Sequence, residues 1–203
     1  MVAALAHATG RAKEDRRAKS AKGTTHVSVV DGDGAFVSMT TSNGSCSGVM
    51  AEHTGVQLNN VMGEADLHPE GFHATAPGTR VGSMMAPMLL DLPDGRVVAL
   101  GSGGSERIKS ALLSVVLALT DGRTPLAEAV AAPRIHHDGT AIQVEPGLRA
   151  HTQAALAAEG PLNRWKAQDL YFGGVHAVAR ATDGRLEAVG DTRRDGVGLI
   201  VQL

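Results

Sequence analysis

Apolar and polar residues alternate along residues 24–29, which is the pattern of a strand with one buried face. An Asp-Gly-Asp-Gly turn at 31–34 and a second strand over 35–41 complete a predicted β-hairpin. One face of the first strand carries Thr25, Val27 and Val29, and the other carries Thr24, His26 and Ser28.

The segments that flank this hairpin are less regular. Residues 2–22 are basic and rich in alanine, and we expect a polar helix there that ends at Gly23. Residues 41–48 are rich in Ser and Gly and indicate a loop, and a short strand is possible over 55–58. Residues 60–80 show little periodicity, so we expect a long irregular segment, which in a compact domain usually has a function.

The second half of the chain has clearer periodicity. A buried strand over 96–100 leads through a glycine-rich turn at 101–104 into a helix over 105–119. The apolar stripe of that helix comprises Ile108, Leu112, Val115, Val116 and Leu119. The other predicted elements are helices over 125–131 and 148–158 and strands over 141–144, 175–181, 186–190 and 198–202.

Composition narrows the possible classes of protein. The 203 residues suffice for one domain with a substantial core, and the net charge of −2 suggests no nucleic-acid or membrane-surface partner. No stretch approaches the roughly 20 apolar residues of a membrane span. The first 23 residues do not resemble a signal peptide, and both a cytoplasmic and a periplasmic location remain alternatives. Cys46 is the sole cysteine, which excludes an internal disulfide.

The Gly23–Thr24 pair is a candidate for nucleophilic chemistry. A threonine hydroxyl needs a base, and a threonine at a chain terminus has its own α-amino group, with a pKa of about 8. Thr24 is internal, so the Gly23–Thr24 bond would first have to be cut, and Gly23 leaves room for Thr24 to attack its carbonyl. Taken alone, a threonine at the start of a strand is usually an ordinary strand residue.

A second candidate is the segment 101–107, Gly-Ser-Gly-Gly-Ser-Glu-Arg, between a strand and a helix. Backbone N–H groups at such a turn can converge on an anion or a developing oxyanion. A dinucleotide fingerprint would place a third glycine at Glu106, where a carboxylate would instead face a pyrophosphate, so we disfavour nucleotide binding. A plain connection between strand and helix is the remaining alternative.

Metal binding has weaker support. His136, His137 and Asp138 lack partners at metal-ligand spacing, and we interpret them as structural or solvated. Asp31 and Asp33 resemble the start of a calcium loop, but the later ligands of such a loop are missing. We therefore expect neither a metal nor another cofactor.

Several motifs together resemble the small subunit of the γ-glutamyltranspeptidase family. They occur in the order and at the spacing of that family, most closely from Thr24 to Val144 and more loosely to the end. The motifs are Thr24–Asp31 with Gly34, Val37–Ser42, Leu58–Met62, Ser83–Pro87, Gly101–Arg107 and Ala132–His137.

The resemblance implies an α+β fold, the four-layer αββα sandwich of N-terminal nucleophile hydrolases. It implies self-cleavage at Gly23–Thr24 and a nucleophilic Thr24, whose hydroxyl bonds a hydroxyl eighteen residues on, here Ser42. It places the oxyanion hole at the backbone N–H groups of Gly104 and Ser105. Ser105 replaces a glycine, which a backbone donor tolerates if its φ stays negative.

The substrate-binding positions depart from the family pattern. Gly44 stands where the family has Asn or Glu, Val61 where Gln is often found, and Glu64 where an Asp holds the substrate amino group. Ser83 and Met84 match a Ser-Ser pair. The catalytic positions thus match the family better than the positions that recognise the γ-glutamyl group. This pattern resembles the divergent bacterial branch of the family, which includes cephalosporin-acylase-like relatives.

The resemblance also implies a partner. Residues 1–23 resemble the end of the family's large subunit with its linker, and residues 24–203 the catalytic small subunit. We expect a heterodimer with a large subunit, from the same precursor or a separate chain. The leading hypothesis is a γ-glutamyl transferase or hydrolase acting on glutathione or a related amide. The alternatives are the same chemistry on an acylated β-lactam or poly-γ-glutamate, and an inactive remnant without its large subunit.

Overall fold

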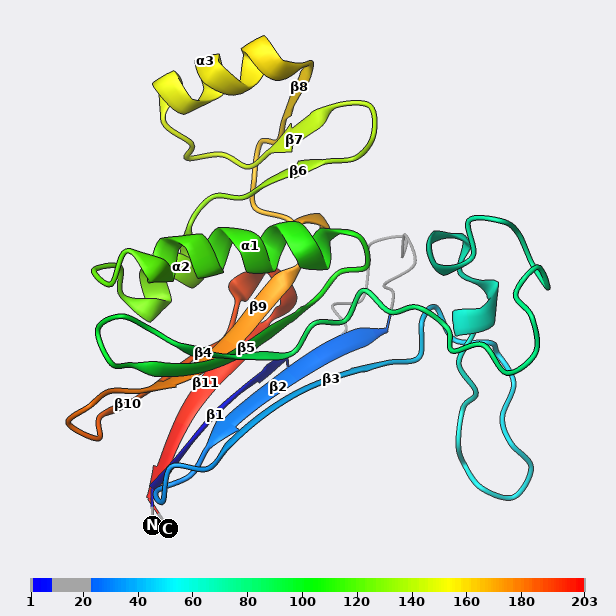
Figure 1. Ribbon diagram of the computed structural model, residues 1–203, viewed down its shortest axis with the longest axis horizontal. Helices are drawn as coiled ribbons and strands as arrows, with labels where there is room; N and C mark the ends of the chain where they lie inside the picture. Colours follow the sequence, from blue (N-terminus) through cyan, green and yellow to red (C-terminus); the bar gives the residue numbers. More distant parts are fainter. Residues whose placement is uncertain (1, 9–22, 203) are drawn as a thin grey trace.

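The computed structural model describes residues 2–8 and 23–202, which form two stacked β-sheets with helices on one outer face (Figure 1). The first sheet has the strand order β11-β1-β2-β3 and the second the order β10-β9-β5-β4. A smaller sheet, β6-β7-β8, lies with α3 beyond the helices (Figure 1). None of the helices in the described ranges is long and apolar enough to span a membrane.

The first sheet is antiparallel throughout and contains the predicted hairpin. Its strands are β1 (Val2–Ala8), β2 (Thr24–Val30), β3 (Phe36–Ser42) and β11 (Gly196–Gln202). The prediction of a helix over residues 2–22 is wrong for 2–8. That segment pairs with β2 on one side and β11 on the other, and these ladders override the helix preference of alanine. The rest of the predicted helix, 9–22, lies outside the described residues.

The second sheet contains β4 (Met88–Asp91), β5 (Val97–Gly103), β9 (Gly174–Arg180) and β10 (Leu186–Val189). The predicted glycine turn at 101–104 begins too early, because β5 continues to Gly103. Its last residues keep pairing with β9, from Gly101 opposite His176 to Gly103 opposite Gly174. The turn itself starts at Gly104, just before the helix.

Helices α1 (Arg107–Thr120) and α2 (Leu126–Ala131) cover the outer face of the second sheet (Figure 1). The predicted stripe of α1 is confirmed, with Val116 half-buried at its margin. At about 25 cal/mol per Å² of apolar surface, this layer is the main source of hydrophobic stabilisation in the described residues. Its buried members are Leu92, Val98, Leu100, Ile108, Ala111, Leu112, Val115, Leu119, Leu126, Ala129, Val130, Val175, Ala177 and Ala179.

The remaining elements are short. The small sheet comprises β6 (Ile135–His137), β7 (Ile142–Val144) and β8 (Leu162–Arg164), with α3 (Ala150–Glu159) beside it. The irregular segment after Asn60 is confirmed and contains two single 3₁₀ turns, η1 (Val61–Gly63) and η2 (Ala65–Leu67). The strand proposed for 55–58 is reduced to one bridge, Met50 with Gln57. Further 3₁₀ turns are η3 (Leu170–Phe172) and η4 (Thr192–Arg194).

The described residues thus form two stacked sheets and one helical layer on them, with the small sheet and α3 beyond that layer (Figure 1). The outer face of the first sheet is apolar and open to solvent, since Val37 and Met39 are 53% and 51% exposed. By strand register, Leu199 and Val201 of β11 lie on the same face and are also exposed.

Candidate active site

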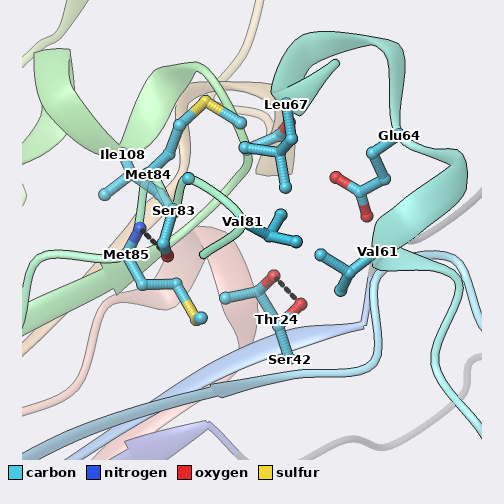
Figure 2. A pocket seen from close by; sticks show the side chains of 12 residues that line it. Thr24, Ser42, Val61, Glu64, Leu67, Val81, Ser83, Met84, Met85 and Ile108 are labelled. Atoms are coloured by element: carbon cyan, nitrogen blue, oxygen red, sulfur yellow. Dashed lines mark hydrogen bonds between the residues drawn. The ribbon is translucent and has the colours of Figure 1, made fainter. Parts of the chain in front are cut away.

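The hydroxyls of Thr24 and Ser42 meet at the end of the first sheet. Thr24 opens β2, Ser42 closes β3, and the two residues are direct antiparallel partners. Their Oγ atoms are 2.8 Å apart (Figure 2). Ser42 Oγ also accepts a hydrogen bond from the Gly44 N–H at 3.0 Å. The hairpin register therefore brings the Thr24 hydroxyl next to that of Ser42.

The end of β5 packs directly against Thr24. A Cβ atom at Gly103 would lie 2.6 Å from the Thr24 carbonyl oxygen, so the strands can approach this closely only because residue 103 is glycine. A Cβ at Gly104 would lie 2.8 Å from the Cα of Gly173. The glycine turn is thus held between the nucleophile candidate and the chain that leads into β9.

Ser105 departs from the expected backbone conformation. Its φ is +54°, not negative, so the serine occupies the left-handed region that favours glycine, at a cost of about 1–2 kcal/mol. Its hydroxyl donates a hydrogen bond to Asp66 Oδ2 at 3.0 Å, which ties the glycine turn to the segment that carries η2. The replacement keeps a glycine-like backbone and adds a side-chain contact.

A cavity of about 240 Å³ adjoins Thr24 (Figure 2). It brings together six of the predicted site residues, whereas Gly23, Gly44 and Gly104 do not line it. Val61, which the resemblance put at a substrate-binding position, also lines it. The remaining lining residues are mainly apolar and were not predicted as site residues, because isolated apolar residues, most of them in loops, carry no signal of a binding site. The lining consists of Thr24, Ser42, Val61, Glu64, Leu67, Val81, Gly82, Ser83, Met84, Met85, Ser105 and Ile108.

Glu64 is the one charged side chain in that lining. Gly44 has a φ of +62°, and a Cβ there would lie 2.4 Å from Glu64 Oε1 and 2.2 Å from Asn60 Oδ1. Asn60 Oδ1 in turn accepts a hydrogen bond from the Ser45 N–H. Gly44 therefore leaves the space that lets Asn60 and Glu64 approach the end of β3.

His26 lies on the same face of β2 as Thr24 and is buried between the two sheets. Its ring nitrogens bond the hydroxyls of Thr40 at 2.7 Å and Ser28 at 2.8 Å. Burial, with a further contribution from nearby His176, lowers its pKa to about 4. His26 is therefore neutral at physiological pH.

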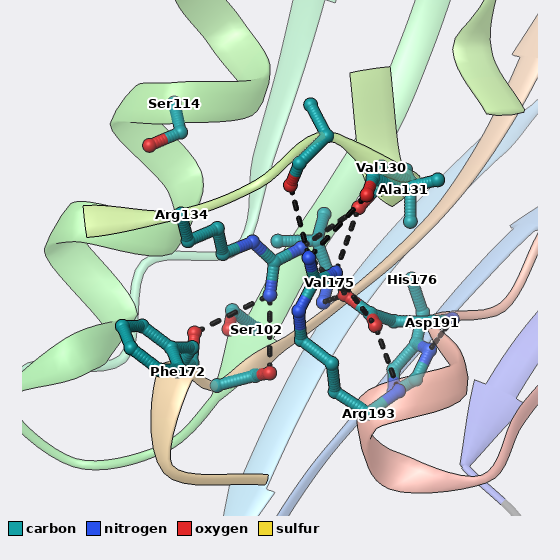
Figure 3. A network of polar contacts seen from close by, with 12 residues as sticks. Ser102, Ser114, Val130, Ala131, Arg134, Phe172, Val175, His176, Asp191 and Arg193 are labelled. Carbon is teal, nitrogen blue, oxygen red and sulfur yellow. Dashed lines mark hydrogen bonds and ion pairs between the residues drawn. The ribbon is translucent and has the colours of Figure 1, made fainter. Parts of the chain in front are cut away.

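Arg134, Asp191 and Arg193 belong to a buried ionic network (Figure 3). Arg134 pairs with Asp191, and its Nη1 donates to the carbonyl of Gly173 at 3.0 Å. Arg193 pairs with both Asp191 and Glu145. Because Gly173 packs on Gly104, this network fixes the position of the turn.

The His136–Asp138 cluster has structural contacts. His136 is buried and bonds the Ser110 hydroxyl at 2.8 Å, whereas His137 is exposed. The Asp138 carboxylate accepts the backbone N–H groups of Thr140 and Ala141, which hold its pKa far below the ordinary value. Within residues 2–8 and 23–202, no three His, Cys, Asp or Glu side chains are grouped so that they could hold a metal ion.

Comparison with known proteins identifies relatives of two kinds. The chain is 37% identical over 183 residues to the acylase ACY 1 proenzyme of Pseudomonas sp. (strain SE83), and 31% identical over 185 residues to the glutathione hydrolase proenzyme of Escherichia coli (strain K12). These matches cover 88% and 84% of this chain but only 32% and 31% of the relatives. The chain thus spans about a third of the length of these curated relatives.

Solved structures agree with these matches. A γ-glutamyltranspeptidase from Pseudomonas nitroreducens superimposes with a TM-score of 0.69 at 29% identity, covering 87% of this chain and 99% of that chain. The transpeptidase CapD of Bacillus anthracis gives a TM-score of 0.66 at 26% identity, with coverage of 85% and 96%. The family model for gamma-glutamyltranspeptidase matches residues 3–201. The chain therefore belongs to the γ-glutamyltranspeptidase family and has the α+β fold of its N-terminal nucleophile hydrolases.

Proposed function

We propose that this chain is the catalytic part of an acyl-transfer enzyme that uses Thr24 as nucleophile. The observation that carries the proposal is the Thr24–Ser42 hydroxyl pair, which lies beside the glycine turn and opens into the cavity. Acyl transfer requires a hydroxyl nucleophile, a partner hydroxyl that orients it, and backbone N–H groups that donate to the oxyanion.

The first step is processing of the chain itself. Thr24 Oγ1 attacks the carbonyl carbon of Gly23, the peptide bond breaks, and the acyl group moves to oxygen as an ester. Water then hydrolyses the ester, leaving a carboxylate on Gly23 and a free α-amino group on Thr24. The Gly23 carbonyl accepts a hydrogen bond from the Asn43 N–H at 3.2 Å, which orients that peptide next to the hairpin end.

The processed site then acts on an amide substrate. The Thr24 α-amino group accepts the hydroxyl proton as Oγ1 attacks the substrate carbonyl, and the N–H groups of Gly104 and Ser105 donate to the oxyanion. The amine leaves with the proton and an acyl-threonine remains. Water or an acceptor amine then attacks the ester and regenerates Thr24. Ser42 orients the nucleophile throughout.

The substrate we favour is a γ-glutamyl amide such as glutathione. Glu64 supplies a carboxylate for the substrate ammonium, and the Ser83–Met84 segment lies across the cavity from it (Figure 2). Val61, like Gly44, offers no side-chain hydrogen bond to the amino-acid head group. Each hydrogen bond to a charged group that is lost costs about 1.5–3 kcal/mol, so γ-glutamyl binding should be weak.

A second candidate is the same chemistry on a less polar acyl amide. It is favoured by the apolar lining and by the acylase relative at 37% identity. The apolar side chains of the cavity are Val61, Leu67, Val81, Met84, Met85 and Ile108.

We further propose a large-subunit partner for residues 24–203, with residues 1–23 as the end of that subunit and its linker. The known relatives are proenzymes, and the exposed apolar face formed by Val37, Met39, Leu199 and Val201 is suited to a partner layer. Without a partner, the chain would be an inactive remnant.

Steady-state kinetics of the enzyme assembled with its large subunit test the substrate. We expect slow turnover of a γ-glutamyl anilide, with hydrolysis exceeding transfer to glycylglycine, and a KM raised tenfold or more by Glu64→Gln. Glu70→Gln, an exposed carboxylate in the same segment, is the matched control and should change nothing.

Two outcomes would change this conclusion. Faster cleavage of a glutaryl amide, with no effect of Glu64→Gln, would favour the second candidate. A low-micromolar KM for glutathione with strong stimulation by acceptor would show that γ-glutamyl recognition is intact despite Val61 and Gly44.

A further inference from the structure

The Arg194 side chain lies against the glycine turn and does not line the cavity. Its stem runs along Gly174, where a Cβ atom would lie 2.8–2.9 Å from the Cβ, Cγ and Cδ atoms of the arginine. Its Nη1 and Nη2 atoms lie 3.5 and 3.6 Å from the Cβ positions of Gly103 and Gly104. Three glycines therefore leave the space that this side chain occupies.

The guanidinium and the nucleophile flank the same glycine. The Cβ position of Gly103 that lies 3.5 Å from Arg194 Nη1 also lies 2.6 Å from the carbonyl oxygen of Thr24. No side chain intervenes at residue 103, so the positive charge acts on Thr24 across a short, largely buried path.

The charge of Arg194 is poorly compensated. Among the described residues its Nε is buried without a hydrogen-bond partner. Asp191 attracts it, but that carboxylate already accepts from Arg134, Arg193 and the Val175 N–H. Burial and the like charge of Arg107 on α1 lower the pKa of Arg194, yet an arginine stays protonated in proteins.

We propose that Arg194 tunes the reacting centre through space, keeping the α-amino group of processed Thr24 in its free-base form and favouring negative charge at the glycine turn. A nearby positive charge disfavours an ammonium and stabilises an oxyanion. Arg107, the like charge that acts on Arg194, adds to this positive charge, whereas Asp191 reduces it. Glu64 in the cavity and Asp66 on the Ser105 hydroxyl act against it. The inference rests on the proposed role of Thr24.

The pH dependence of kcat/KM in the processed enzyme tests this inference. In Arg194→Gln the α-amino group of Thr24 should become more basic, because a nearby positive charge is lost. The acidic limb of the kcat/KM profile should therefore move to higher pH by about one unit, with activity lost below neutrality. Arg194→Lys keeps the charge and should keep the wild-type limb. The matched control is Arg185→Gln, an exposed arginine whose loss changes the net charge equally and should leave the limb in place.

An unshifted limb in folded, processed Arg194→Gln would overturn the inference, as would a raised KM without a shift, which would assign Arg194 to substrate binding. If the Arg194→Gln variant does not cleave itself at Gly23–Thr24, the Arg194→Lys variant decides. An acidic limb that lies at higher pH in Arg194→Lys than in the wild type would then overturn the inference. Thr24→Ala separates the two proposals. Activity that survives in Thr24→Ala removes the proposed function, whereas inactive Thr24→Ala with an unshifted Arg194→Gln removes only this inference.

Discussion

At the scale of single residues, the inner face of β2 is a row of hydroxyls and imidazole where a sheet interface usually carries aliphatic side chains. Thr24 pairs with Ser42, and His26 with Thr40, in successive inward positions of the hairpin. Each buried polar atom of His26 has a partner, which avoids the cost of about 1–3 kcal/mol for an unsatisfied group. This row extends from the nucleophile into the protein interior.

His26 predicts a pH dependence of stability. Its pKa is about 4 in the folded protein and about 6.5 when unfolded, so the unfolded state binds the proton more readily. The stability present above pH 6.5 should fall between pH 6.5 and 4, by roughly 3 kcal/mol. Urea denaturation across this range should show the decline, and His26→Gln should reduce it. His137→Gln, at an exposed histidine, should leave it unchanged, and an equally steep decline in His26→Gln would contradict the account.

The individual site residues differ in how far the sequence reveals them. Thr24 and Ser42 stand in motifs that resemble the family, Glu64 follows another such motif by two residues, and the structure places all three around one cavity. Arg194 was not predicted, because its significance depends on the space left by glycines far away in sequence. The left-handed φ of Ser105 could not be predicted either, since only the turn geometry imposes it.

At the scale of elements, the glycines of β5 allow a close approach between the two sheets. A Cβ atom at Gly101 would lie 2.2 Å from the His26 ring, and one at Gly103 would lie 2.6 Å from the Thr24 carbonyl oxygen. These glycines belong to a paired strand, so their function is close approach between layers and not a turn.

Gly103→Ala should therefore disrupt the site. The new methyl group meets backbone, which cannot move aside as a flexible side chain can, so we expect a stability loss of about 1–3 kcal/mol and strongly slowed processing. Gly160→Ala is the control, since its φ of 164° is extended and nothing lies within 4 Å of the added atom. Chemical denaturation and N-terminal sequencing measure both effects, and normal processing in Gly103→Ala would contradict the proposed packing.

The elements with long periodic patterns were predicted correctly, and so were the short helix α2 and the short strand β7. The alanine-rich strand β1 and the short strands β4, β6 and β8 were not predicted. The stripe of α1 and the β2–β3 hairpin are examples of the long periodic patterns. The alanine-rich strand β1 was mistaken for a helix, because its pairing partners lie at opposite ends of the chain. The three-residue strands β6 and β8 are too short to show an alternation.

At the scale of the whole molecule, the described helices cover only one of the two stacked sheets (Figure 1). The second sheet is covered by α1 and α2, whereas the described residues place no helix over the outer face of the first sheet (Figure 1). Exposed apolar side chains gather on that open face, as expected for a surface that binds a partner. Since the chain spans about a third of its curated relatives, a large subunit is the partner we propose.

The most direct test of the account is the N-terminus of the chain after assembly with its large subunit. Intact mass and N-terminal sequencing should reveal a fragment that starts at Thr24. Thr24→Ala should leave the Gly23–Thr24 bond uncut, and Thr24→Ser, which keeps a hydroxyl, should be cut. Cleavage that persists in Thr24→Ala, or an assembled wild-type protein that stays uncut at Gly23–Thr24, would contradict the proposal that Thr24 is the nucleophile.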